Sequence, residues 1–319
     1  MFTLPTKELI LPKLEQWQLD QIKPVDGELG MFQRDTIADY LQADIDAYSL
    51  QMYWENEPRH HLGASVIGHY CIRFVWMHFR WVLEEIPKPR MTRLWYRGHR
   101  EEPVIIQQLR GIGCNVIEIE DGEQLHIQRD EADGHFGGSL DALIQMPARY
   151  GLPPIWFLLE MKALGDKYYK DFANLGVLKA KMQYYSQMCV YAHKITQLGK
   201  YGTIDYALFY PVNKNNDEIS PEIVRLDRNF GQEEINKAEY LSRQYYPPIK
   251  LSTSESHWEC KICPMHKICH LNQPYAVNCR SCRFAEPVAD GQWRCHNYNQ
   301  IIPKDFLIKG CPAWESLPR

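Results

Sequence analysis

The chain has 319 residues, of which 45% are hydrophobic and 24% are charged, and its formal net charge is −4. This balance is that of a globular protein with one large core and a small appendage, and it excludes a low-complexity chain or a strongly basic nucleic-acid coat. A locally positive cleft could still bind DNA. The N-terminus lacks a signal-peptide pattern, and the most apolar helix candidate, residues 64–86, carries charged side chains and histidines. We therefore expect a cytoplasmic protein without a membrane span.

The sequence pattern predicts an α/β fold, in which a central mixed sheet is flanked by helices and followed by a Cys-rich C-terminal module. The predicted elements, in chain order, are an extended arm to about residue 34, helices at about 35–50, 60–86 (with Cys71 in mid-helix) and 97–111, strands at 115–120, 124–129, 136–145 and 155–163, a long helix at 170–196, strands at 203–211 and 223–226, and a helix at 232–245. The predicted domains are 1–50 (arm and first helix), 51–250 (catalytic core), 251–275 (cysteine segment closing on Cys71) and 276–319 (small zinc-like module).

Three charged side chains stand out within this predicted core. Glu160 and Lys162 are two residues apart in an apolar run, so in a strand they share one face, while Phe157, Leu159 and Met161 share the other. Asp141 follows Gly137 and Gly138 in the preceding strand, so a carboxylate from each strand can converge on one site. Carboxylate oxygens suit Mg²⁺ or Mn²⁺, and a bound metal would polarise a scissile phosphate and activate water.

A Glu-x-Lys pair alone is weak evidence, because most such pairs are ion pairs at a strand end. Three further features favour a site. Glu102, in the segment Gly98–Glu102, offers another carboxylate at the start of a helix. Gln183, Gln187 and Tyr191 recur at i, i+4 and i+8 as a polar–aromatic stripe suited to backbone contact, although a solvated face is the plain alternative for Gln183. The order helix, hairpin, strand, helix can bring all of these groups to one edge of the sheet.

The ordered set Gly-x3-Glu, Gly-x2-Asp, Glu-x-Lys and Gln-x3-Tyr resembles the signature of the PD-(D/E)xK nuclease superfamily, in the branch with the RecB nuclease domain and phage λ-type exonucleases. The resemblance spans about residues 60–270 and implies a restriction-endonuclease-like core. It also implies Asp141 and Glu160 as metal ligands, Glu102 as an accessory ligand, Lys162 as the catalytic lysine, and Gln187 and Tyr191 as the DNA-side motif. Leu140 stands where many members have proline, and His99 falls three residues before the accessory position.

Seven of the ten cysteines lie in the last sixty residues, which indicates metal sites rather than disulfides in a cytosolic chain. Cys260-x2-Cys263-x5-Cys269 supplies three thiolates, and Cys71 is the best candidate for a fourth. The alternatives are a buried, unliganded Cys71, or His257, His266 or His270 as substitute ligands. Spacing alone fits zinc and iron–sulfur equally. One cysteine before the nuclease motifs and three after them resembles the staple of AddB-type and CRISPR-adaptation nucleases, which implies a structural 4Fe–4S cluster.

A second set, Cys279, Cys282, Cys295 and Cys311, fits a small zinc ribbon or knuckle, with a second iron–sulfur cluster or unliganded thiols as alternatives. Trp293 and Trp314 could pack over it. The basic residues of this segment could touch the DNA backbone but are mostly expected on solvated surface; they are Arg280, Arg283, Arg294, Lys304 and Lys309. Cys114 and Cys189, in apolar surroundings, are expected in the core.

We therefore expect a Mg²⁺-dependent DNA exonuclease of phage-type recombination or repair. The alternatives are a CRISPR-adaptation-like nuclease that trims ends within a complex, a catalytically silent DNA-binding scaffold organised by metal clusters, and an electron-transfer iron–sulfur protein. The metal-ligating carboxylate pair argues against the scaffold. An electron-transfer role would leave the nuclease-like strand pair unexplained. The expected partner is linear duplex DNA or single-stranded ends, and a single-strand annealing protein is a further partner by analogy only.

Overall fold

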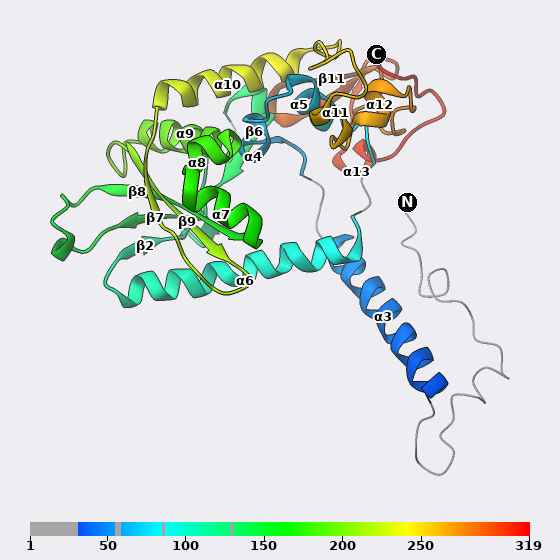
Figure 1. Cartoon of the computed structure of the whole chain (residues 1–319). Coiled ribbons are helices and arrows are strands. Elements are labelled where there is room, and N and C mark those ends of the chain that lie inside the picture. Colours follow the sequence, from blue (N-terminus) through cyan, green and yellow to red (C-terminus); the bar gives the residue numbers. More distant parts are fainter. Residues whose placement is uncertain (1–30, 55–58, 85–86, 128–129) are drawn as a thin grey trace. The chain divides into compact units, whose positions relative to one another are not determined.

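The computed structural model describes residues 31–54, 59–84, 87–127 and 130–319 (Figure 1). It divides into two compact units, one of residues 1–58 and 85–99 and one of residues 59–84 and 100–319. The predicted N-terminal arm falls almost wholly outside the described residues. No described helix has both the length and the apolarity that crossing a bilayer would need.

The first unit contains helix α3 (Met31–Trp54) and the first turns of α6 (Pro89–Gly111). Arg93 links these helices, because its guanidinium lies 2.5 Å from the Asp46 carboxylate and 3.2 Å from the Ser49 hydroxyl. Both groups of the Arg93–Asp46 pair are more than a third exposed, so the pair adds little stability.

The second unit is built around a five-stranded mixed sheet of order β10-β9-β8-β7-β2. Its strands are β2 (Asn115–Ile117), β7 (Ala142–Gln145), β8 (Trp156–Leu164), β9 (Tyr206–Asn213) and β10 (Glu222–Arg225). β8 and β9 are parallel and the other neighbours are antiparallel. The crossover from β8 to β9 runs through helices α7 (Asp166–Leu175), α8 (Val177–Ala180) and α9 (Met182–Gln197). The mixed α/β class predicted from the sequence is confirmed.

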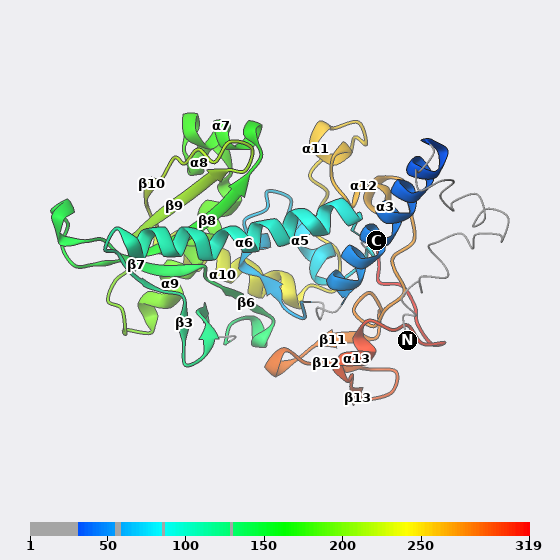
Figure 2. The same cartoon turned by 90° about the horizontal axis from the view of Figure 1, so that it is seen from below.

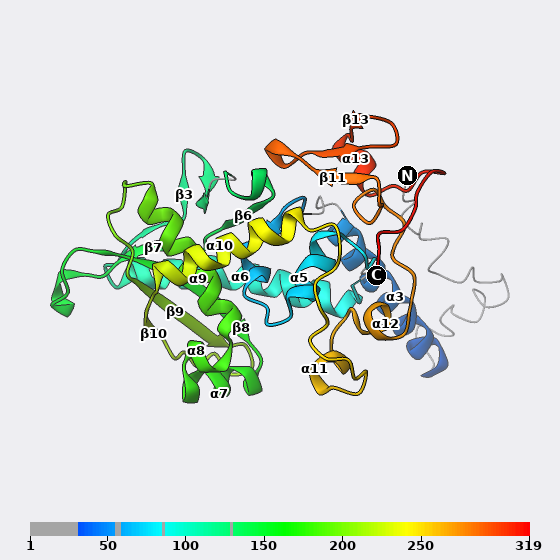
Figure 3. The ribbon, with the colours of Figure 1, turned by 90° about the horizontal axis from the view of Figure 1, so that it is seen from above.

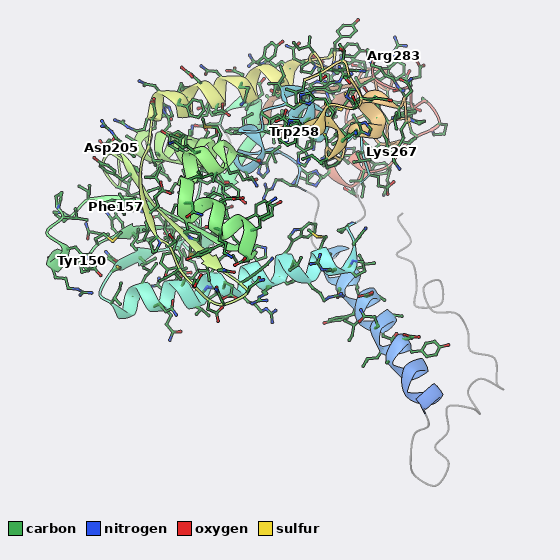
Figure 4. All side chains as sticks on the ribbon, in the orientation of Figure 1. Tyr150, Phe157, Asp205, Trp258, Lys267 and Arg283 are labelled. Carbon is green, nitrogen blue, oxygen red and sulfur yellow. The ribbon has the colours of Figure 1, made fainter. Side chains whose placement is uncertain are left out.

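Each face of this sheet buries its own hydrophobic cluster. The C-terminal half of α6 crosses one face (Figure 2), and α9 covers the other with α10 (Arg228–Arg243) packed against it (Figure 3). Phe157, Leu159 and Met161 of β8 pack on the α6 side, whereas Leu158 packs on the α9 side. The predicted alternation along this strand is therefore confirmed. Phe157 lies within the strand layer, and Tyr150 lies midway along the β7–β8 connection, at the outer tip of this loop (Figure 4).

The segment predicted as one strand at 136–145 is divided between two sheets. β6 (Phe136–Ser139) pairs with β1 (Leu62–Gly63) and β5 (His126–Ile127) in a three-stranded sheet, while β7 belongs to the central sheet. The break falls at Leu140, whose backbone N–H donates to the Leu125 carbonyl and whose side chain is fully buried. A separate hairpin pairs β3 (Ile119–Glu120) with β4 (Glu123–Gln124).

The predicted helix at 60–86 is also interrupted, so placing Cys71 in mid-helix was wrong. The structure has α4 (Ala64–Ile67) and α5 (Ile72–Phe79), with Cys71 as the residue that precedes α5. The Cys71 backbone N–H donates to Nδ1 of His69 at 3.1 Å. A side chain thus satisfies a backbone donor that a continuous helix would give to a carbonyl, and α5 begins as a separate helix after Cys71.

The predicted long helix at 170–196 is three helices, α7, α8 and α9. The first of these helices ends before Gly176, which has φ +73°. A Cβ at this position would lie 2.9 Å from Oε1 of Glu222. The other carboxylate oxygen of Glu222 accepts the Val177 N–H at 2.9 Å. A strand residue distant in sequence therefore fixes this break.

The C-terminal region adds short elements around a third small sheet. They are α11 (Trp258–Lys261), α12 (His266–His270), β11 (Ala285–Pro287), β12 (Trp293–Cys295), β13 (Gln300–Ile301) and α13 (Lys304–Leu307). The strands pair antiparallel in the order β11-β12-β13. Three short 3-10 turns, Ala132–Gly134, Ala148–Tyr150 and Ala289–Gly291, complete the described elements.

Candidate functional site

The charged residues singled out on β7 and β8 do meet. Ala142 pairs with Leu159 across the two strands, so extending the register by one residue places Asp141 opposite Glu160. Oδ2 of Asp141 accepts the backbone N–H of Met161 at 2.7 Å, which fixes its carboxylate at the end of the strand pair. The break before β7 thereby positions this carboxylate beside β8.

Lys162 lies between the two carboxylates. Its Nζ is 2.5 Å from Oε1 of Glu160 and 3.9 Å from Oδ2 of Asp141, and it donates to the Met161 carbonyl at 3.0 Å. Burial lowers the pKa of Lys162, but the carboxylates of Glu160 and Asp141 outweigh burial and raise this pKa above its usual value. The side chain therefore carries a positive charge at neutral pH.

Glu160 is fully buried, whereas the side chain of Asp141 is 17% exposed. Burial raises the pKa of Glu160 to about 7, Lys162 opposes that rise, and the charges of Asp141 and Glu102 add to it. Within the described residues, neither oxygen of Glu160 has a hydrogen bond of good geometry, so the short contact of Oε1 with Lys162 is an ion pair only. A buried carboxylate oxygen without a hydrogen-bond partner lowers the stability of the fold unless a cation binds it.

The other predicted members of the site lie around this pair. Glu102 on α6 is close enough for its charge to raise the pKa of Glu160. Tyr191 is buried on α9, and burial together with the Glu160 charge raises its pKa. Gln187, also buried, donates weakly to the Tyr191 hydroxyl at 3.4 Å. Gln183, for which a solvated face was the alternative, donates to the Ser65 carbonyl and so ties α9 to α4.

Sequence reasoning missed two residues next to Lys162. The ring of Tyr184 lies with its centroid 5.4 Å from Nζ of Lys162 and 4.3 Å from Nζ of Lys181. Tyr184 precedes Gln187 by one helical turn, so the helical period could have drawn attention to it. Lys181 carried no such signal, because it lies at the break between α8 and α9.

The first cysteine set is brought together from both ends of the second unit. Burial raises the pKa of the Cys263 thiol to about 11, and the neighbouring Cys71, Cys269 and Cys260 thiols add to the rise. Backbone turns hold the segment, since the Cys263 N–H donates to the Cys260 carbonyl at 3.1 Å and the Cys269 N–H to the Met265 carbonyl at 2.8 Å. The alternative ligand His270 has a buried Nε2 without a hydrogen-bond partner among the described residues.

The second cysteine set also converges. Burial raises the pKa of Cys279 to about 11, and Cys311, Cys282 and Cys295 contribute to the rise. The Cys282 N–H donates to the Cys279 carbonyl at 3.1 Å, and Cys295 lies on β12 opposite Ala285. All four thiols are free. In the part of the chain that the structure describes, no three His, Cys, Asp or Glu side chains are spaced closely enough to form a metal site as they stand, so a metal at either cysteine set or at Asp141, Glu160 and Glu102 stays a prediction.

Arg280 is an exception to the expectation that most of the basic residues of the C-terminal segment lie on the surface. It is only 1% exposed, and its guanidinium lies over the rings of Trp81, Phe79 and Trp293 at 4.1, 4.7 and 4.9 Å. Aromatic faces replace part of the hydration that a buried cation loses. Arg280 therefore joins the cysteine-rich segment to α5. Cys114 and Cys189 are buried, as predicted.

Comparison with solved structures finds similar chains at low identity. They include an alkaline exonuclease, LHK-Exo, from Laribacter hongkongensis (TM-score 0.38, 14% identity, 62% of this chain and 89% of that chain) and LHK-Exo in complex with dAMP (0.39, 16%, 57% and 86%). SSO0001 is a third (0.43, 13%, 73% and 98%). No protein-family model and no curated protein matches the chain.

Proposed function

We propose that this chain is a divalent-metal-dependent deoxyribonuclease that hydrolyses phosphodiester bonds at DNA ends, in phage-type recombination or DNA repair. One observation carries the proposal. Glu160 is fully buried and paired with Lys162, which also lies near Asp141, and the Oε2 atom of Glu160 has no hydrogen-bond partner among the described residues. The order of these residues, with Gln187 and Tyr191 behind them, resembles the PD-(D/E)xK signature and indicates the reaction class.

The donor set fits a hard cation. Asp141, Glu160 and Glu102 offer only carboxylate oxygens, which Mg²⁺ and Mn²⁺ prefer. A bound metal would polarise the scissile phosphate and lower the pKa of its water. Burial and the charges of Asp141 and Glu102 raise the pKa of Glu160, and a divalent ion bound there would favour its ionised form.

Lys162 supplies a fixed positive charge beside the carboxylates. Its Nζ is anchored by the Met161 carbonyl and by Glu160, so its position does not depend on substrate. A cation that is already oriented stabilises charge developing on the phosphate without reorganisation. Lys162 would also repel a second metal ion, which favours a site with one ion.

We further propose that Cys71, Cys260, Cys263 and Cys269 hold a structural 4Fe–4S cluster and that Cys279, Cys282, Cys295 and Cys311 hold zinc. The first set joins the residue before α5 to a segment almost 200 positions later, so a cluster there would close a long loop. In the second set, Cys295 belongs to a strand of a small antiparallel sheet, which resembles the arrangement of a zinc ribbon.

The test is digestion of a linear duplex that carries distinguishable labels at its two ends. Anaerobically purified wild type and Asp141→Ala are compared with Mg²⁺, and a covalently closed circle of the same sequence is the substrate control. We expect mononucleotide release from the linear duplex by wild type only. Cleavage of the circle would show that the enzyme is an endonuclease. Equal release of mononucleotides by Asp141→Ala would show that the active site lies elsewhere.

A further inference from the structure

The Tyr184 ring is a platform shared by two ammonium groups. Nζ of Lys162 lies 5.4 Å and Nζ of Lys181 lies 4.3 Å from its centroid. Phe172 stacks on Tyr184 at 5.7 Å with an interplanar angle of 10°, and Phe209 lies 6.3 Å from it. Because buried aromatic neighbours hold the ring, it fixes where both cations can lie.

Two hydrogen bonds hold the backbone of Lys181 in place. Its N–H donates to the Val177 carbonyl at 2.9 Å, and its own carbonyl accepts the Tyr184 N–H at 3.0 Å. The residue is exposed and, within residues 31–54, 59–84, 87–127 and 130–319, forms no ion pair. Its charge nevertheless acts toward the interior, since after burial it is one of the groups that lower the pKa of His69.

The charges around Lys181 indicate which ligand it could bind. The Asp141 and Glu160 carboxylates lie next to Lys162 and the charge of Glu102 also reaches Glu160, so the reacting centre itself repels the polyanionic backbone of DNA. Lys181 lies beside this centre across a single ring and is exposed, and none of the described carboxylates pairs with it. A lysine in that position gains most from a phosphate, which releases condensed counterions when it is neutralised.

We propose that Lys181 binds a backbone phosphate of the DNA substrate close to the one that is cleaved, and that Tyr184 positions Lys181 for this contact. The proposal rests on the proposed nuclease function. The ligand class is a nucleic-acid phosphodiester, and no base is read. Lys181 is a binding residue and Tyr184 a positioning residue.

Two neighbouring lysines provide matched controls. Lys179 on α8 is equally an exposed lysine, but it has neither an ion pair nor a cation–π contact within the part of the chain that the structure describes. Lys170 on α7 is exposed and paired with Asp166 at 2.8 Å. Replacing either removes the same charge without touching Tyr184, so non-specific loss of positive charge is separated from loss of the phosphate contact.

The experiment is titration of a labelled short duplex DNA at a series of salt concentrations, with Ca²⁺ in place of Mg²⁺. Wild type, Lys181→Met, Lys181→Arg, Lys179→Met and Lys170→Met are compared. For Lys181→Met we expect the slope of log K against log salt to fall in magnitude by about 0.9, the value of one lost phosphate contact. Lys181→Arg keeps the slope, as do both control variants. Equal slopes for Lys181→Met and Lys179→Met, or no binding by wild type, would overturn the proposal.

Tyr184 is tested by ring-keeping and ring-removing variants. Tyr184→Phe retains the slope, whereas Tyr184→Leu lowers it as Lys181→Met does, and the double variant Lys181→Met/Tyr184→Leu shows no further decrease. In cleavage assays Lys181→Met raises KM and leaves kcat nearly unchanged. If the salt dependence of DNA binding changes in Lys181→Met but the wild type does not cleave DNA, the proposed nuclease function is wrong and the proposed phosphate contact still stands. If the wild type cleaves DNA and Lys181→Met changes neither the salt dependence of binding nor KM, only the proposed phosphate contact is wrong.

Discussion

The hydroxyl oxygen of Tyr191 lies 2.6 Å from the point where a Cβ on Gly138 would stand, so only a glycine leaves room for it. Tyr191 belongs to α9 and Gly138 to β6, three residues before Asp141. Two motifs that are separate in the sequence, Gly-x2-Asp and Gln-x3-Tyr, therefore depend on one packing contact.

Gly138→Ala should lower the free energy of unfolding by about 1–3 kcal/mol, because the added methyl group overlaps a buried ring that cannot move away. Chemical denaturation of the whole chain measures this. The reference is Gly111→Ala, where nothing lies within 4 Å of the added Cβ, and we expect a change within about 0.5 kcal/mol there.

Combining Gly138→Ala with Tyr191→Phe should restore part of the loss. The hydroxyl is the closest atom, while the ring carbon Cε1 still lies 3.0 Å from the added group. A double variant that is no more stable than Gly138→Ala would mean that the contact with Tyr191 does not set the cost.

Lys162→Ala should slow cleavage of linear duplex by at least about 100-fold, because a preorganised cation next to the reacting phosphate is lost. Binding of the same duplex with Ca²⁺ should be retained, since this buried ammonium is largely compensated by Glu160. Single-turnover rates and binding titrations measure the two effects. Lys170→Ala, an exposed lysine on α7, controls for general charge loss, and cleavage retained in Lys162→Ala would show that the lysine is not catalytic.

The raised pKa of Glu160 predicts how the metal-free protein responds to pH. Folding favours the protonated carboxyl, because its pKa is about 7 in the fold against 4.5 ordinarily. This contribution is full below about pH 4.5 and is lost as pH rises toward 7. Relative to Glu160→Gln, the wild type should lose about 3 kcal/mol of unfolding free energy over that range. Denaturation curves at several pH values in a chelator measure the difference, and parallel pH profiles would contradict it.

Metal binding should displace the same proton. At pH near 6.5 most Glu160 side chains are protonated and Mg²⁺ must bind the ionised form, so binding releases a large fraction of one proton per metal ion. Calorimetry in buffers with different heats of ionisation detects this release without any cleavage. Glu160→Gln has no such proton, and an equal release from that variant would assign the proton to another group.

Local periodicity could predict the strand that carries the site, because the period of two along β8 is set by residues that are neighbours in the chain. Glu160 and Lys162 accordingly share the face turned to α9, as the alternation of Leu158 and Leu159 requires. The class of fold followed from the same patterns.

The breaks could not be predicted, because distant residues cause them. Glu222 interrupts the helix at Gly176, and Leu125 takes the backbone N–H at Leu140, where the chain leaves one sheet for another. Arginine is a residue type that is usually exposed. Arg280 can be buried because the rings of Trp81, Phe79 and Trp293, which are separate in the sequence, pack around its guanidinium in the fold. Tertiary contacts override local preference in each case.

The two cysteine sets should lose their metals independently. Cys263→Ser removes a thiolate from the first set, so we expect loss of iron with zinc retained, and lower soluble yield because the tie between Cys71 and the C-terminal segment is broken. Cys295→Ser should remove zinc and leave iron. Elemental analysis of anaerobically purified protein measures both, with Cys114→Ser as the control, since that buried thiol belongs to neither set. Iron unchanged in Cys263→Ser would place any cluster elsewhere, and simultaneous loss of both metals in each variant would mean that the two sets fold as one unit.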